Sequence, residues 1–98
     1  NALVSLRLAD IEYSRSNFDK ALSLLAQPHT PEYQALYEEL KGDILTAKGD
    51  NAGASTAYQT ALDNLEESDT RSRALLELKI NELTLVDSNA ADAGKEDT

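Results

Sequence analysis

The stretch that decides the fold is GDILTAKGDNAGASTAYQTAL, residues 42–62, in which a polar loop with two glycines leads directly into a helical run. Gly49 lies where a left-handed residue ends one helix, and Asp50 is then placed to cap the next. A Walker-type phosphate loop needs a lysine and a hydroxyl residue right after its second glycine, but here Ala54 follows Gly53. The stretch therefore predicts the turn of a helical hairpin rather than a catalytic loop.

The same pattern occurs earlier in the chain, at an offset of 33 residues. The offset aligns identical residues in the pairs Ala2–Ala35, Leu3–Leu36, Asp10–Asp43, Ile11–Ile44 and Ala21–Ala54. It also aligns Ala9 with Gly42, and small residues there let a partner helix approach closely. Leu25 aligns with Tyr58, and these large side chains are expected to fill the space between successive hairpins. A repeat of this length, with two helices in each unit, is typical of stacked helical hairpins.

Apolar residues at helical spacing predict five helices and an all-α fold. The predicted ranges are about 2–15, 18–27, 31–48 and 51–65, and a last helix that Ser68 or Asp69 caps. Thr30 before Pro31 predicts the start of the third helix, and Asn17 is the predicted cap of the second. The predicted buried residues are Val4, Leu8 and Ile11, with Leu6, Ala9 and Tyr13, in the first helix; Tyr33, Leu36, Tyr37, Leu40, Ile44 and Ala47 in the third; and Leu76, Ile80 and Leu83 in the last.

The two units predict two hairpins, which the last helix caps, within one domain of residues 1–86. The spacing L-A-x-x-x-x-x-x-S-x-F-x-x-A-x-x-x-L-x-x-P of residues 8–28, with its counterpart in residues 42–62, resembles the tetratricopeptide repeat. The second unit has Lys41 where a leucine is usual and Asn51 where an aromatic residue is usual, so it is expected to pack less tightly.

The two ends of the chain have different patterns. The helical pattern is already present at residue 2 with no capping residue before it, so we expect the chain to be a fragment of a longer repeat array. Residues 87–98, DSNAADAGKEDT, contain no large apolar side chain. They cannot bury enough surface to offset their chain entropy, so they are predicted to form a disordered acidic tail.

Composition argues against several classes of function. The formal net charge is -9, and the resulting repulsion opposes binding to nucleic acid phosphates and to anionic lipid headgroups. There is no cysteine and His29 is the single histidine, so no metal, no cofactor and no catalytic residue is predicted. The apolar runs are far shorter than a membrane-spanning helix, so no direct membrane contact is expected of this chain.

Asp10 and Asp43 are the polar pair of most interest, because the repeat places them at equivalent positions on the first helix of each hairpin. Such helices line the concave face of tetratricopeptide arrays. Neighbouring helices pack about 10 Å apart, which is too far for an acid–base dyad or a shared cation. Solvated surface carboxylates and a partner-binding groove both remain open readings. The hypothetical groove consists of Leu6, Asp10, Tyr13, Glu39, Asp43 and Thr46.

The composition of this face bears on the kind of partner. Leu6, Asp10, Glu39 and Asp43 stand where the carboxylate clamp of co-chaperone tetratricopeptide domains has lysine and asparagine. That difference argues against binding acidic C-terminal tails, and the acidic field favours basic or neutral partners. Tyr13 is the best aromatic candidate for the groove, since aromatic residues with a polar tip are common in protein interfaces.

Three longer stretches, residues 1–25, 36–62 and 75–85, resemble the YfgM family of proteobacteria. The most specific elements are L-R-L-A, G-D-x-L-x-x-K-G-D and L-K-I-N-x-L. The resemblance implies the C-terminal part of a periplasmic tetratricopeptide-like domain, with a single-pass inner-membrane anchor upstream. It also implies an ancillary subunit of the SecYEG translocon that associates with the membrane-anchored periplasmic chaperone PpiD. The family has no established catalytic residues to carry over.

These observations predict a non-enzymatic protein-interaction scaffold that links the protein translocation channel to periplasmic chaperones. An alternative of a different class is an architectural or self-associating module. In that case the N-terminal end of the chain would stack on further repeats or on a second copy. Sedimentation at several concentrations separates the two, because only self-association depends on concentration.

Overall fold

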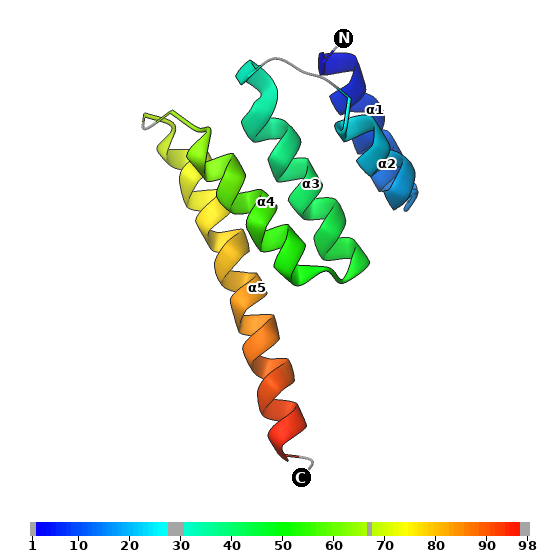
Figure 1. Cartoon of the computed structure of the whole chain (residues 1–98). Helices are drawn as coiled ribbons and strands as arrows, with labels where there is room; N and C mark the ends of the chain where they lie inside the picture. Colours follow the sequence, from blue (N-terminus) through cyan, green and yellow to red (C-terminus); the bar gives the residue numbers. More distant parts are fainter. Residues whose placement is uncertain (1, 28–30, 67, 97–98) are drawn as a thin grey trace.

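The computed structural model describes the backbone of residues 2–27, 31–66 and 68–96 and the side chains of residues 3–27, 31–66 and 68–85. Its helices are α1 (Ala2–Ser14), α2 (Phe18–Leu25), α3 (Gln34–Lys48), α4 (Asn51–Asp63) and α5 (Thr70–Glu96), with a short 3-10 helix, η1 (Pro31–Tyr33). These described ranges contain no β-strand. Figure 1 shows two antiparallel hairpins, α1–α2 and α3–α4, with α5 packed on α4. The predicted all-α fold of stacked hairpins is confirmed.

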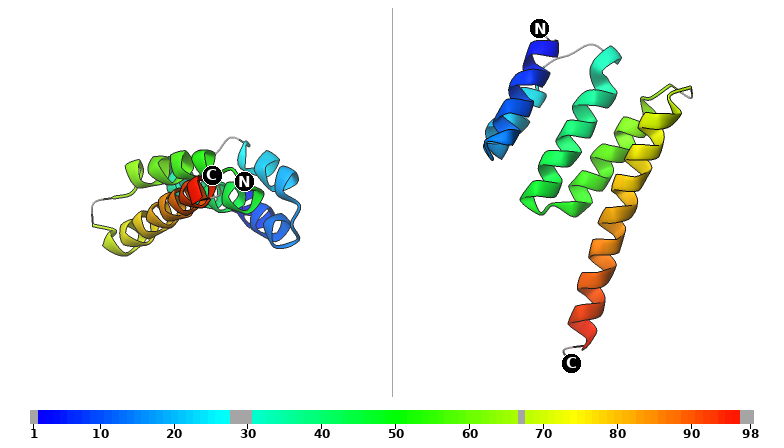
Figure 2. Two further views of the ribbon diagram at one scale, coloured as in Figure 1. Left: turned by 90° about the horizontal axis from the view of Figure 1, so that it is seen from below. Right: turned by 180° about the vertical axis from the view of Figure 1, so that it is seen from behind.

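The helices together form an arch. Seen along the bundle in the left view of Figure 2, α1 and α5 lie on the inner side of the arch and α2 and α4 lie on the outer side. The first helix of the second hairpin, α3, lies between them. It lines one surface depression together with α1 and another together with α5. The inner, concave surface of the arch is therefore built by α1, α3 and α5.

Two apolar clusters hold the arch together. One joins the first hairpin to α3, and its buried members are Ala9, Ala21, Leu25, Tyr37, Leu40 and Ile44. The other joins α4 to α5, and its buried members are Ala54, Tyr58, Ala61, Leu76 and Leu83. Each fully buried large side chain contributes about 1.5–3 kcal/mol relative to an exposed one. The predicted stripe of the last helix is confirmed at Leu76 and Leu83, while Ile80 is half-buried.

The predicted buried stripe of α1 is wrong in part. Val4, Leu8 and Ile11 are exposed, whereas Ala9 is buried as predicted and Leu6 and Tyr13 are partly buried. Glu12, which was not predicted to be buried, is buried as well. The physical reason is that α1 packs mainly against α2 and, to a smaller extent, against α3, so the side of α1 turned away from them faces solvent. Leu36 and Ala47, predicted to be buried on α3, are also exposed, and Leu36 faces the inner surface of the arch.

The two hairpin turns have the same backbone geometry. Gly49 follows α3 with φ +86°, and the aligned Ser16 after α1 has φ +64°, which is unusual for a residue with a side chain. Asp50 caps α4 as predicted, because its Oδ1 accepts a hydrogen bond from the Gly53 N–H at 3.0 Å. A Cβ at Gly53 would meet this carboxylate, so Gly53 makes room for the cap. The predicted cap Asn17 instead donates from Nδ2 to Glu12 Oε2 at 2.9 Å.

Helix boundaries differ from the prediction at two places. The α-helix α3 begins at Gln34, because Pro31–Tyr33 forms a 3-10 turn; the predicted cap Thr30 and the neighbouring His29 lie outside the described residues. The second difference is that α5 continues to Glu96, where a disordered tail was expected, and Figure 1 shows it extending past the other helices. The tail contains no proline, and once a helix has formed each added residue contributes another backbone bond. The domain boundary at residue 86 stays a prediction.

Candidate functional site

The inner surface of the arch carries a groove made of two adjoining hollows. The first, which we call the leucine hollow, has a volume of about 400 Å³ and lies between α1 and α3. It is lined by Leu3, Leu6, Arg7, Asp10, Leu36, Glu39, Leu40 and Asp43. The second, the tyrosine hollow, has a volume of about 290 Å³ and is lined by Tyr13, Asp43, Thr46, Tyr58, Lys79, Glu82 and Leu83. Asp43 belongs to both hollows, so they form one continuous surface.

All six residues predicted for the groove line one of these hollows. The leucine hollow contains Leu6, Asp10, Glu39 and Asp43, and the tyrosine hollow contains Tyr13, Asp43 and Thr46. They come together because residues three or four apart share one face of a helix, and α1 and α3 present equivalent faces to the inside of the arch. The six predicted residues therefore lie in one groove. That this groove binds a partner stays a prediction.

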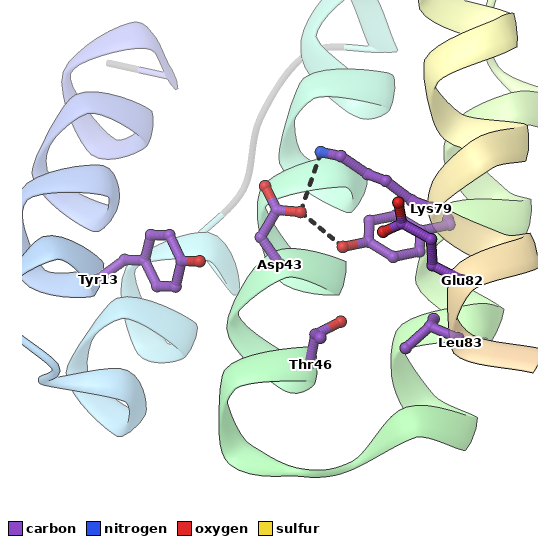
Figure 3. Close-up of a pocket in the computed structure, with 7 residues that line it drawn as sticks. Tyr13, Asp43, Thr46, Lys79, Glu82 and Leu83 are labelled. Carbon is purple, nitrogen blue, oxygen red and sulfur yellow. Dashed lines mark hydrogen bonds and ion pairs between the residues drawn. The ribbon is translucent and has the colours of Figure 1, made fainter. Parts of the chain in front are cut away.

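Lys79 of α5 is the electrostatic centre of the groove. Its Nζ lies 3.0 Å from Glu39 Oε2 and 3.0 Å from Asp43 Oδ1, and 5.5 Å from the centroid of the Tyr58 ring. Figure 3 shows Lys79 reaching from α5 to Asp43. Burial alone would lower the pKa of Lys79, but the hydrogen bonds and negative charges of the two carboxylates outweigh it and hold this pKa above its usual value. Lys79 therefore stays charged and links α5 to α3.

Tyr58 of α4 forms the floor beneath Lys79. Its hydroxyl donates to Asp43 Oδ1 at 2.5 Å (Figure 3), and burial, reinforced by this carboxylate, raises the pKa of Tyr58 well above its ordinary value. The ring fits because Gly42 has no side chain: a Cβ there would lie 2.6 Å from Tyr58 Cδ1 and closer still to Cε1. The helix that approaches Gly42 closely, as predicted for a small residue, is therefore α4, through Tyr58. Because Gly42 has no Cβ, the Tyr58 ring can lie where its hydroxyl reaches Asp43.

The arrangement is suited to contact more than to reaction. Glu39 and Asp43 already accept hydrogen bonds from Lys79, and Asp43 also accepts one from Tyr58, so neither is a free general base. Within the ranges that the structure describes, no three histidine, cysteine, aspartate or glutamate side chains are grouped closely enough to hold a metal ion. What the groove offers is an apolar floor of leucines, tyrosine and threonine hydroxyls, and charged groups at its edge.

The sequence interpretation missed Lys79 and Glu82 and assigned Tyr58 only to the core. A signal for Lys79 was present: it follows Leu76 by three residues and precedes Leu83 by four, so it lies on the buried side of its helix. A lysine at such a position requires an acidic partner on the facing helix. Lys79 also makes the groove less acidic than expected, because it pairs with two of the groove carboxylates, Glu39 and Asp43.

Known proteins resemble this chain over most of its length. Residues 1–85 match the protein family described as "Tetratricopeptide repeat-like domain". Proteins named "Ancillary SecYEG translocon subunit" are similar: the one from Haemophilus influenzae is 29% identical over 82 residues and the one from Escherichia coli 27% over 84. The protein of that name from Neisseria gonorrhoeae is 30% identical over 82 residues. No solved structure gave a significant match.

These alignments cover 84–86% of the chain but only 39–40% of each relative, so the chain spans about two fifths of their length. The likeness that the sequence motifs predicted is confirmed. In the part of the chain that the structure describes, no helix has both the length and the apolar character needed to cross a bilayer.

Proposed function

Because the chain belongs to the tetratricopeptide repeat-like family, we propose that it is a non-catalytic interaction module whose concave groove binds a segment of another protein. The observation that carries this proposal is the groove itself, in which α1, α3 and α5 contribute side chains to one surface. The bonds of Lys79 to Glu39 and Asp43 hold α5 and α3 in register before a partner arrives. Such preorganisation lowers the ordering cost of binding.

The two hollows favour different parts of a partner. The leucine hollow suits an apolar side chain, and Asp10 at its edge is exposed and suits a basic one. The tyrosine hollow offers the Thr46 hydroxyl and the charged groups of Lys79 and Glu82, which suit polar or backbone groups. With a net charge of -9, the chain as a whole attracts basic segments and repels acidic ones. We therefore expect a basic or neutral segment with an apolar anchor.

The similarity to ancillary SecYEG translocon subunits supports a more specific role for this module. In this proposal the chain acts at the periplasmic side of the bacterial inner membrane, where it binds the translocon and links it to periplasmic chaperones such as PpiD during protein translocation. A transmembrane anchor would belong to sequence upstream of this chain.

Site-specific photo-crosslinking in native membranes tests this role. A photoreactive residue is placed at Asp10 or Thr46 in the groove, and at Gln59, exposed on α4 outside it, as the matched control. We expect translocon subunits or the chaperone to be captured from the groove positions and not from Gln59. Capture from Gln59 alone, or equal capture from all three, would contradict the assignment of the groove.

A charge reversal at Asp10 gives a second test. Asp10→Lys should weaken binding of the identified partner roughly five- to tenfold, since a rim carboxylate would become a cation, whereas the exposed Asp63→Lys on α4 should not. Asp43 is less suitable for this test, because its replacement would also disturb Tyr58 and Lys79. Equal effects of the Asp10 and Asp63 substitutions would indicate a general charge effect and remove the groove from the proposal.

A second candidate function, the architectural module, is favoured by one specific observation. Val4, Leu8 and Ile11 form an exposed apolar face on α1, on the side away from α2 and α3. Sedimentation equilibrium of the wild-type chain distinguishes self-association from a monomer. A mass that rises with protein concentration supports the self-associating form, and a constant monomer mass removes it.

A further inference from the structure

The outer face of α5 carries a row of exposed leucines, in the helix that lies at the opposite end of the arch from the first hairpin (Figure 2). Its members Leu75, Leu78 and Leu85 are 47%, 53% and 62% exposed, respectively. They lie on the side of α5 turned away from Leu76 and Leu83, which are buried in the cluster that joins α4 to α5. Single exposed leucines are ordinary on a protein surface, whereas a row along one helix indicates a surface that another helix can cover.

Two exposed charged residues continue this row. Arg71 lies four residues before Leu75, Leu78 follows Leu75 by three residues, and Glu82 lies four residues after Leu78. This alternation of four and three is the spacing of the contact positions in a two-helix coiled coil. Among the side chains that the structure describes, neither Arg71 nor Glu82 makes an ion pair. The outer face of α5 therefore has an apolar centre with a cation at one end and an anion at the other.

We propose that this face of α5 binds the same face of a second copy of the chain, with the two α5 helices antiparallel. A twofold axis midway between Leu75 and Leu78 places Leu75 of each copy against Leu78 of the other. Because Arg71 and Glu82 are equally far from that axis, the same pairing places Arg71 of each copy against Glu82 of the other. A parallel pair would instead place Arg71 beside Arg71 and Glu82 beside Glu82, and like charges repel.

The symmetry of the row favours a second copy over a segment of another protein. An interface between identical faces requires that each group and its complement lie equally far from one centre, as Arg71 and Glu82 do, whereas a different partner sets no such condition. The surroundings leave these groups available: α5 contacts α4 through its opposite side, and Lys79 is directed to α3. The pairing does not depend on what the groove binds.

The interface is small, and this sets its strength. It centres on two leucines and two charged side chains from each copy, which bury far less than the roughly 800 Å² per partner of a standard interface. The net charge of -9 on each copy also opposes association. We therefore expect a weak, reversible dimer with a dissociation constant of roughly 100 µM. Glu82 also lines the tyrosine hollow, so the dimer holds two grooves beside one interface.

Sedimentation equilibrium at protein concentrations from about 10 µM to about 1 mM tests the pairing. We expect the wild-type mass to rise with concentration from that of a monomer toward that of a dimer. Leu78→Asp should abolish the rise, because it buries a charge at the centre of the interface. Leu8→Asp is the matched control: Leu8 is similarly exposed, at 45%, but lies on α1, so this variant should associate as the wild type does.

Charge reversal tests the antiparallel register. Arg71→Glu and Glu82→Arg each place like charges opposite one another and should weaken the dimer roughly five- to tenfold, whereas the double variant restores opposite charges and should recover most of the affinity. In a parallel pair the single variants would change little, because like charges already face each other there. Circular dichroism checks that every variant keeps its helices.

Three results would overturn the proposal. A wild-type chain that stays monomeric up to about 1 mM would leave the face of α5 to a different protein segment. Association that Leu8→Asp abolishes and Leu78→Asp does not would move the contact to α1. Equal affinities of the wild type, the two single charge variants and the double variant would remove the antiparallel pairing of Arg71 with Glu82.

Discussion

The first and second hairpins place aligned residues in different surroundings. Asp10 is exposed on α1, whereas the aligned Asp43 on α3 is bonded to Lys79. Ile11 is exposed, whereas the aligned Ile44 is fully buried. The cause is position in the array: α3 packs between α2 and α4, while α1 packs mainly against α2 and, less extensively, α3. The comparison teaches that aligned residues of the two repeats differ in burial and bonding according to which helices pack against them.

The hairpins also differ in their side chains at the turn. In the first, the Tyr13 and Phe18 rings lie 6.1 Å apart and pack against the core. Their counterparts are Thr46 and Asn51, so the second hairpin has no aromatic pair there, as predicted from Asn51. In its place Tyr58 packs between α3 and α5 and makes the bond to Asp43. The first hairpin thus has an aromatic pair at its turn, whereas the second has a polar network at the groove.

The largest expected effect comes from truncating the aligned isoleucines. Ile44→Ala should destabilise the protein by about 2–5 kcal/mol, because it leaves a cavity in a fully buried site. Ile11→Ala should cost roughly 0.5 kcal/mol or less in the 98-residue chain, since Ile11 is exposed. Urea denaturation followed by circular dichroism measures both. Equal losses would show that α1 is buried in solution on its outer face.

Adding a methyl group at Gly42 tests the network of the second hairpin. Gly42→Ala should destabilise by about 1–3 kcal/mol, because its Cβ would meet the Tyr58 ring and the ring cannot move without leaving Asp43. In the first hairpin, Ala9 packs in the same cluster as Leu25, the counterpart of Tyr58. Tyr58→Leu in the Gly42→Ala background should therefore recover part of the loss. Additive losses in the double variant would contradict this contact.

Replacing Lys79 separates the electrostatic link from apolar packing. Lys79→Met keeps the side chain's length over Tyr58 but leaves the half-buried Glu39 and Asp43 without their cation, and it should cost about 1–2 kcal/mol. Lys41→Met, at an exposed position on α3, is the matched control and should be nearly neutral. A neutral Lys79→Met variant would mean that the link contributes no stability.

The same variant gives a pH test whose sign follows from the raised pKa of Lys79. A cation with a folded pKa above its unfolded value, about 10.4, stabilises fully below that value and loses its contribution as the pH rises through the folded pKa. The free-energy difference between wild type and Lys79→Met should therefore be constant from neutral pH to about 10 and shrink above it. A difference that grows with alkaline pH would contradict the pairing.

The smallest expected effect concerns the turns. Ser16 adopts a φ of +64° where the second hairpin has Gly49 at +86°. Ser16→Gly should stabilise the protein by roughly 0.5–1 kcal/mol, because glycine adopts a positive φ without steric cost. Gly49→Ser should destabilise by a similar amount, and both are measurable as shifts in the thermal midpoint. A loss of stability in Ser16→Gly would mean that the Ser16 side chain is needed in the turn.

Much of the groove could be predicted because it depends on local periodicity. Leu6 and Asp10 lie one turn apart on α1, Glu39 and Asp43 lie one turn apart on α3, and the repeat places both pairs on the same face. Lys79 was not predicted, because its partners lie 36 and 40 residues away in sequence. The packing of α5 across α4 brings those charges together, and no pattern within α5 states which helix it faces.

The sequence by itself determined the five helices in outline, the turn at Gly49, the repeat and the inner face of the arch, because capping, backbone preference and spacing act within a few residues. Only the tertiary structure decided which side of α1 is open and how Lys79, Tyr58 and Asp43 join α3, α4 and α5. An apolar stripe on a helix specifies that it can be buried. Burial itself requires a neighbouring helix, and that neighbour is set by long-range packing.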